Sequence, residues 1–85
     1  MIEIRIFTGK NCPNCPLAKK ILEEVSKEFG DKIKIIEVDI EKEPEEALMF
    51  QVTSTPSIAI GENTIFFGKV PKKEELKEEI KKALA

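Results

Sequence analysis

The sequence predicts an α/β fold, a mixed four-stranded sheet flanked by helices, in a single domain over residues 1–85. In some segments apolar and charged residues alternate, as in strands, and in others apolar residues recur every three or four positions, as in helices. The resulting order is strand, helix, strand, helix, strand, strand, helix. The helix between the first two strands requires a parallel pair, and the short turn between the last two requires an antiparallel pair. The sheet is therefore mixed.

The first half of the chain contains a strand, a helix and a second strand. Residues 2–7 alternate apolar and charged side chains and end in an apolar pair. The helix begins near Pro13 and Pro16, because a proline deeper inside would break its hydrogen bonds. Gly30 is well placed to cap its C-terminus, and residues 33–38 form the next strand. The apolar face of the helix consists of Leu17, Ala18, Ile21, Leu22, Val25 and Phe29.

The second half contains a short helix, a hairpin and a final helix. Pro44 begins the short helix, whose first turn is acidic. Residues 57–60 and 64–67 read as strands joined by a short turn, and the last helix runs from about Pro71 to the C-terminus. The apolar side of the short helix offers Ala47, Leu48 and Phe50, and the last helix buries Leu76, Ile80 and Leu84.

Composition excludes several functional classes. The net charge of −2 comes from 14 basic and 16 acidic residues spread along the chain, without the basic blocks typical of nucleic-acid binding. No apolar run approaches the length of a membrane span, and Met1 leads directly into the first strand without a basic and apolar leader. We therefore expect a cytoplasmic protein that binds neither nucleic acid nor membrane.

The two cysteines of the chain, Cys12 and Cys15, lie where the first strand passes into the first helix. A disulfide between them closes too short a loop to stabilise the fold much. In a cytoplasmic protein such a pair is more often catalytic or metal-binding than structural. A helix N-terminus favours the thiolate, which is the nucleophile in disulfide exchange. Spacing and position indicate redox chemistry, and an inert buried pair or half of an intermolecular metal site are the alternatives.

Two motifs carry a resemblance to a known family. Cys12-Pro13-Asn14-Cys15 follows the first strand, and Thr55-Pro56 comes directly before the hairpin. With this order of elements, the chain resembles the thioredoxin/glutaredoxin family over essentially all 85 residues. In its size it resembles the small, glutaredoxin-sized thioredoxins of archaea. The resemblance implies a cis bond before Pro56, packed beside the cysteines. It also implies a redox-active disulfide with no separate cofactor or metal.

The chain departs from the family patterns at three places. Thioredoxins usually have Trp before the first cysteine and Gly-Pro between the two, whereas Asn11 precedes the pair here and Pro13-Asn14 intervene. Ile6 stands where thioredoxins carry a buried acid. Glutaredoxins bind glutathione partly through a Gly-Gly segment followed by an acid, and residues 68–71 read Gly-Lys-Val-Pro instead. These departures favour direct reduction of protein disulfides over glutathione-dependent activity.

Each residue of the cysteine motif has an expected role. Cys12 attacks the substrate disulfide, and Cys15 then resolves the mixed disulfide. Lys10 is a candidate for stabilising the Cys12 thiolate, with a solvated loop lysine as the alternative. Pro13 and Asn14 are expected to tune the reduction potential, although Asn14 is equally explained as a polar residue at a helix start.

Thr55 and Pro56 are expected to support the reaction. The Thr55 backbone would pair with an extended substrate segment, and by resemblance Pro56 would help to deny the cysteines a third metal ligand. The alternative is that Thr55-Pro56 only marks a turn.

The proton acceptor for Cys15 is less defined, because the chain has no His. Glu37, on the second predicted strand, is the nearest candidate, with an ordinary surface glutamate as the alternative. Water or the departing thiolate could also take the proton. We assign Phe66 and Phe67 to the core and the sheet face rather than to a substrate platform.

The sequence thus predicts a monomeric thiol-disulfide oxidoreductase that reduces disulfide-containing proteins and is recharged by a thioredoxin-reductase-type donor. A glutathione-dependent glutaredoxin is the related alternative. Two other classes are a CxxC soft-metal carrier, which would end in a strand and lack the Thr-Pro element, and a redox-inactive interaction module.

Overall fold

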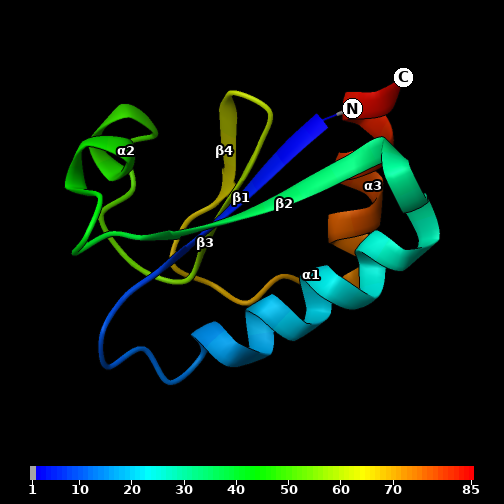
Figure 1. Cartoon of the computed structure of the whole chain (residues 1–85). Coiled ribbons are helices and arrows are strands. Elements are labelled where there is room, and N and C mark those ends of the chain that lie inside the picture. Colours follow the sequence, from blue (N-terminus) through cyan, green and yellow to red (C-terminus); the bar gives the residue numbers. More distant parts are fainter. Residues whose placement is uncertain (1) are drawn as a thin grey trace.

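The computed structural model describes residues 2–85 and contains the predicted order of elements, with a 3₁₀ turn added after the first helix (Figure 1). Met1, the predicted lead into the first strand, lies outside the described residues. The elements are β1 (Ile2–Thr8), α1 (Cys15–Phe29), η1 (Gly30–Lys32), β2 (Ile33–Asp39), α2 (Pro44–Met49), β3 (Ser57–Ile60), β4 (Asn63–Phe66) and α3 (Lys73–Leu84).

The four strands form one mixed sheet in the order β2-β1-β3-β4. β1 pairs in parallel with β2 and antiparallel with β3, and β3 and β4 form the predicted hairpin. Because β1 is an inner strand, the loop that follows it lies near the middle of one end of the sheet, where the strands β1 and β2 finish. This loop, residues 9–14, projects beyond the carboxyl ends of β1 and β2 (Figure 1).

The two faces of the sheet are covered unequally. α1 and α3 pack on one face, whereas the six-residue α2 lies on the other (Figure 1). Because side chains alternate along a strand, Ile4 and Ile6 enter the first core and Phe7 enters the second. The first core is built by Ile4, Ile6, Ala18, Leu22, Val25, Ile33, Ile58, Ile60, Phe66, Leu76 and Ile80, and the second by Phe7, Val38, Ala47, Val52 and Ala59.

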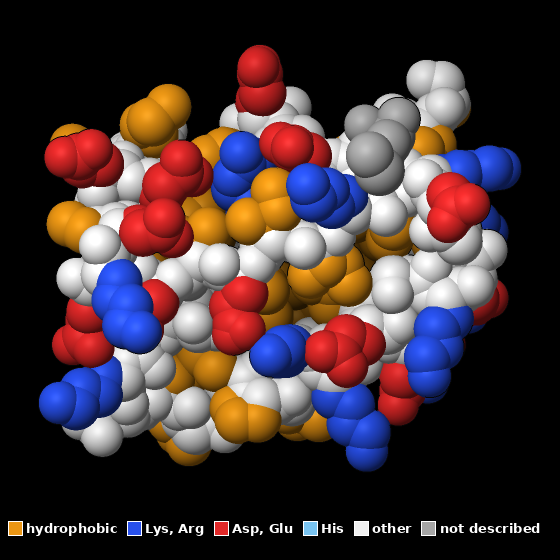
Figure 2. Space-filling view, viewed as in Figure 1, with side chains coloured by type: hydrophobic (Ala, Val, Ile, Leu, Met, Phe, Trp, Pro, Cys, Tyr) orange, Lys and Arg blue, Asp and Glu red, His pale blue; other side chains and the backbone are white. Residues whose placement is uncertain are grey.

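Charged side chains of both signs are mixed on the surface over α1, whereas acidic side chains gather over α2 on the same view (Figure 2). Among residues 2–85, none of the helices combines the length and the apolar character needed to cross a membrane.

β1 and β2 each extend one residue beyond the predicted end, and two other elements begin at different residues than predicted. α3 begins at Lys73 rather than near Pro71, because Lys72 is extended (φ −81°, ψ 149°) and Pro71 is buried in the connection from the sheet. The second hairpin strand covers Asn63–Phe66 rather than 64–67. A register irregularity at Ile58/Ala59 pairs residue 60 with residue 63 and leaves a two-residue turn.

The predicted apolar side of α2 is wrong at one position. Ala47 is buried and Phe50 packs on Phe7, with ring centroids 5.5 Å apart. Leu48, however, is 79% exposed. A helix turns by about 100° per residue, so this single short helix cannot direct Ala47 and its immediate neighbour toward the same sheet.

Candidate active site

Cys12 and Cys15 form a disulfide at the carboxyl end of β1, with their Cα atoms 5.5 Å apart. The two residues differ in burial. Cys12 is partly exposed in the loop, whereas Cys15 is only 6% exposed and belongs to the first turn of α1. The site therefore offers one accessible sulfur and one protected sulfur.

The start of α1 explains this difference. The helix begins at Cys15, and Asn14 is its N-cap, whose backbone oxygen accepts a hydrogen bond from the Ala18 N–H at 3.0 Å. Pro13 and Asn14 lie exposed in a turn before the helix, so Cys12 precedes the helix and is not part of its first turn. Both sulfurs nevertheless lie at the helix N-terminus, whose unpaired N–H groups and dipole favour negative charge.

A cleft of about 320 Å³ opens beside the cysteines. One charged pair lies on its wall: Lys19 Nζ lies 2.9 Å from Glu37 Oε1 and donates a hydrogen bond to it. This hydrogen bond, followed by the attraction of the carboxylate charge, raises the pKa of Lys19 above its usual value. The cleft is lined by Thr8, Gly9, Cys12, Cys15, Pro16, Lys19 and Glu37.

Glu37 lies beside the cysteines, although it is also a half-exposed surface residue paired with Lys19. Glu37 pairs in register with Ile6 of β1, which stands at the position where thioredoxins usually carry a buried acid. Ile6 is completely buried among apolar side chains. The role of Glu37 as a proton acceptor remains a prediction.

Thr55 and Pro56 reach the site from the other side of β1. The peptide bond between them is cis, Pro56 is fully buried, and Thr55 is half-buried. Thr55 lies against Gly9: a Cβ added to Gly9 would be 3.4 Å from the Thr55 hydroxyl oxygen. Because Gly9 also lines the cysteine cleft, the structure brings the two predicted motifs to one place.

Three other predicted residues have simpler surroundings. Lys10 is exposed in the loop. Phe66 is buried in the first core, as predicted. Phe67 follows β4 and is 52% exposed, so it does not cover the sheet face.

Sequence reasoning missed two residues of this region. Lys19 follows Cys15 by four positions, and this helical spacing alone would have placed it on the same side of α1 as the cysteine. Ser57 is fully buried, and its hydroxyl is hydrogen-bonded to the backbone of Ser54 and of Gly68. Its signal was a hydroxyl residue directly after Thr-Pro in an otherwise apolar strand.

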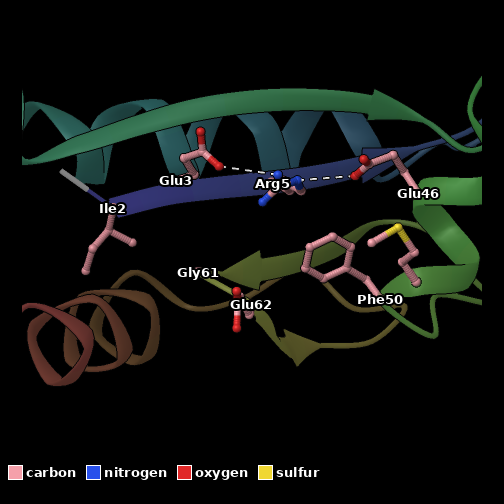
Figure 3. A pocket seen from close by; sticks show the side chains of 8 residues that line it. Ile2, Glu3, Arg5, Glu46, Phe50, Gly61 and Glu62 are labelled. Carbon is pink, nitrogen blue, oxygen red and sulfur yellow. Dashed lines mark hydrogen bonds and ion pairs between the residues drawn. The ribbon is translucent and has the colours of Figure 1, made fainter.

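A second pocket, of about 630 Å³, lies on the α2 side of the sheet, at the opposite end of β1 (Figure 3). Arg5 points between two carboxylates there, 3.3 Å from Glu3 and 3.3 Å from Glu46, and its guanidinium lies 4.8 Å from the centre of the Phe50 ring. The charge of Arg5 is thus already satisfied within the chain. Within residues 2–85, no three His, Cys, Asp or Glu side chains cluster as they would around a metal ion.

Comparison with known proteins agrees with this geometry. A family model for the thioredoxin domain matches residues 2–81. The chain belongs to the thioredoxin family. A probable thioredoxin of Methanothermobacter thermautotrophicus is 40% identical over 80 residues, covering 94% of this chain and 93% of the relative. A thioredoxin of Methanocaldococcus jannaschii is 36% identical over 83 residues, covering 98% and 96%.

Solved structures show the same fold. A structure described as a malarial protein matches with a TM-score of 0.81 and 25% identity, covering 100% of this chain and 99% of the other. The oxidised thioredoxin of Plasmodium falciparum matches with a TM-score of 0.75 and 25% identity, covering 99% and 82%. Membership of the thioredoxin family and the Cys12–Cys15 disulfide make this chain a protein-disulfide oxidoreductase with that disulfide as its redox centre.

Proposed function

We propose that this member of the thioredoxin family reduces disulfides in other proteins through a mixed-disulfide cycle. Cys12 is the attacking residue and Cys15 the resolving residue. The observation that carries this assignment is the difference in exposure: a substrate sulfur can approach Cys12, whereas Cys15 is buried at the start of α1.

The cycle balances as two thiol-disulfide exchanges. The Cys12 thiolate attacks one substrate sulfur, so the substrate S–S bond breaks, a Cys12–substrate bond forms, and a substrate thiolate leaves and takes up a proton. Cys15 loses its proton and attacks Cys12 Sγ. The Cys12–Cys15 bond forms, and the second substrate thiolate leaves. The substrate gains two electrons and the protein is oxidised by two.

The surrounding residues supply position and charge. In this proposal the Thr55 backbone pairs with an extended substrate segment, and the position of the Thr55 side chain next to Gly9, at the cysteine cleft, supports this role. In this proposal Pro56 fixes that turn and limits access of a third metal ligand. Lys10 adds positive charge in the loop, and Pro13 and Asn14 tune the potential through the approach to the helix N-terminus.

The partners follow from this cycle. They are disulfide-containing proteins as substrates and a thioredoxin-reductase-type dithiol donor that returns the two electrons. We propose that residues 1–85 act as one domain and as a monomer in the cytoplasm, without binding nucleic acid or membrane. The net charge of −2 and the mixture of both signs over α1, on the face seen in Figure 2, support the part of this proposal that concerns nucleic acid.

Insulin reduction with dithiothreitol as the electron source tests the cycle. Wild-type protein should accelerate insulin reduction. In a separate incubation without dithiothreitol, pre-reduced Cys15→Ser should accumulate a covalent adduct with insulin through Cys12, detected by mass spectrometry and released when dithiothreitol is added. Cys12→Ser should form no such adduct.

Two results would contradict the proposal. Accumulation of the adduct by Cys12→Ser rather than Cys15→Ser would reverse the assigned roles. Recharging of the oxidised protein by reduced glutathione alone, at a rate sufficient for turnover, would favour the glutaredoxin-type function over a separate reductase.

A further inference from the structure

Ser57 is the first residue of β3 and a fully buried polar side chain in a strand that otherwise reads Ile-Ala-Ile. A buried hydroxyl costs free energy unless it is hydrogen-bonded. This one is bonded in both directions: Ser57 Oγ donates to the Ser54 carbonyl oxygen at 2.7 Å and accepts from the Gly68 N–H at 3.0 Å. The hydroxyl thus joins two segments that are distant in the sequence.

The two segments are the turn that carries Thr55-Pro56 and the chain directly after β4. The backbone of Gly68 packs closely against the side chain of Ser54, so that a Cβ at position 68 would collide with it. Gly68 also has a positive φ of +64°. The Ser57 hydroxyl therefore holds a close approach that only a glycine permits.

Both segments lie at the end of the sheet that carries the redox site, because β4 runs parallel to β1 and residues 67–68 follow β4 as the cysteine loop follows β1. Thr55 contacts Gly9, which lines the cleft with the two cysteines. Ser57 pairs in register with Phe7, two residues before Gly9. On the other segment, Phe67 is an exposed apolar side chain beside Gly68.

We propose that Ser57 is a positioning residue for protein substrates: its hydroxyl fixes the spacing between the Thr55-Pro56 turn and the Phe67-Gly68 segment, which together receive the polypeptide around the substrate disulfide. The inference rests on the proposed function. Without the hydroxyl, the Gly68 N–H loses its partner inside the protein and the two segments lose their fixed spacing. A substrate that docks by its polypeptide then suffers more than one that offers only a disulfide.

Two variants isolate the hydroxyl. Ser57→Thr keeps it, and Ser57→Val has the shape of threonine without it. Steady-state kinetics should be measured with insulin and with hydroxyethyl disulfide, which has no polypeptide to dock. We expect Ser57→Val to raise KM for insulin about tenfold relative to Ser57→Thr, with a smaller change in kcat. The KM for hydroxyethyl disulfide should change less.

Ser26→Ala is the matched control, because the Ser26 hydroxyl bonds to the Glu23 carbonyl oxygen within α1, outside the site. It should behave as wild type with both substrates. Equal KM values of Ser57→Thr and Ser57→Val for insulin would overturn the proposal. An equal loss of activity with both substrates would also overturn it, since a purely structural role predicts that result.

A measurement on the wild-type protein covers the case in which the valine variant does not fold. The Gly68 amide should exchange slowly with deuterium, because its partner is a buried hydroxyl. Exchange at the rate of an unprotected loop amide would overturn the proposal. If wild-type protein reduced neither substrate, the proposed function itself would fail. If wild-type protein turned over normally and Ser57→Thr and Ser57→Val had equal KM values for insulin, only the role of Ser57 would be rejected.

Discussion

At the scale of single residues, chemistry at this site depends on small differences in burial. Cys12 and Cys15 are separated by two residues, yet one lies in a loop and the other is the first residue of α1. The exposed member is open to the approach of another sulfur, whereas the buried member is only 6% exposed and is bonded to Cys12. In the proposed cycle, this difference in burial gives two residues of the same type different chemical roles.

The ion pairs of the chain are mostly exposed, and they contribute little individually. Glu24 of α1 and Lys73 of α3 form one such pair, with the Lys73 Nζ 2.6 Å from Glu24 Oε2. The hydrogen bond from Lys73, followed by its charge, lowers the pKa of the Glu24 carboxyl below its ordinary value of 4.5.

We expect this pair to give a small, acid-sensitive stabilisation. Because the folded-state pKa of Glu24 is lowered, the stabilisation is present above the unfolded-state pKa and is lost as pH falls through the folded-state pKa. Glu24→Gln should thus lower the urea midpoint slightly at about pH 7, and the difference from wild type should close toward about pH 3.

Glu23→Gln is the control for this titration, since the Glu23 carboxylate makes no ion pair with any of residues 2–85. Its urea midpoint should follow wild type across the same range. A wild-type advantage over Glu24→Gln that grew in acid would contradict the assigned sign.

At the scale of elements, α1 has two tasks. Its apolar face contributes Ala18, Leu22 and Val25 to the first core, and its N-terminus holds the redox pair. The cysteine position is therefore fixed by packing several turns away, because a helix that is anchored along its length also fixes the direction of its first turn.

The same substitution at two positions of α1 should separate these contributions. Leu22 is fully buried and Leu17 is 51% exposed. Leu22→Ala should lower the free energy of unfolding by about 2–5 kcal/mol, whereas Leu17→Ala should change it by less than about 0.5 kcal/mol. Urea unfolding followed by circular dichroism measures both, and comparable losses would show that Leu17 is covered in solution.

The hairpin and α2 show what could be predicted from the sequence at this scale. Their existence follows from local patterns, namely strand alternation around a short turn and a proline with acidic residues at a helix start. Their details do not. The irregularity in the pairing of β3 with β4 moved both β4 boundaries by one residue, and the exposed position of Leu48 depends on how α2 is oriented on the sheet.

At the scale of the whole molecule, the sheet divides the protein into two cores of unequal size. The larger lies under α1 and α3, and the smaller lies under α2 (Figure 1). A helix of six residues has few internal hydrogen bonds and little buried surface, so it is expected to open without unfolding of the rest.

Hydrogen exchange under native conditions should reveal this inequality. We expect amides of α2, such as that of Ala47, to exchange on the order of a hundredfold or more faster than amides of β1. NMR-detected exchange of the oxidised protein measures both sets in one sample. Equal protection of α2 and β1 would instead mean that the two cores open as one cooperative unit.

The sequence by itself determined the fold class, the central redox pair and the family resemblance. Hydrophobic periodicity and a CxxC motif at a strand-to-helix junction are local signals, and local signals can be read along a chain. Only the tertiary structure decided that Glu37 faces Lys19 beside the cysteines and that Thr55 contacts Gly9. It also decided that the Ser57 hydroxyl joins residues 54 and 68. These are contacts between distant segments, and their geometry depends on how strands pair and helices pack rather than on any pattern in the neighbouring sequence.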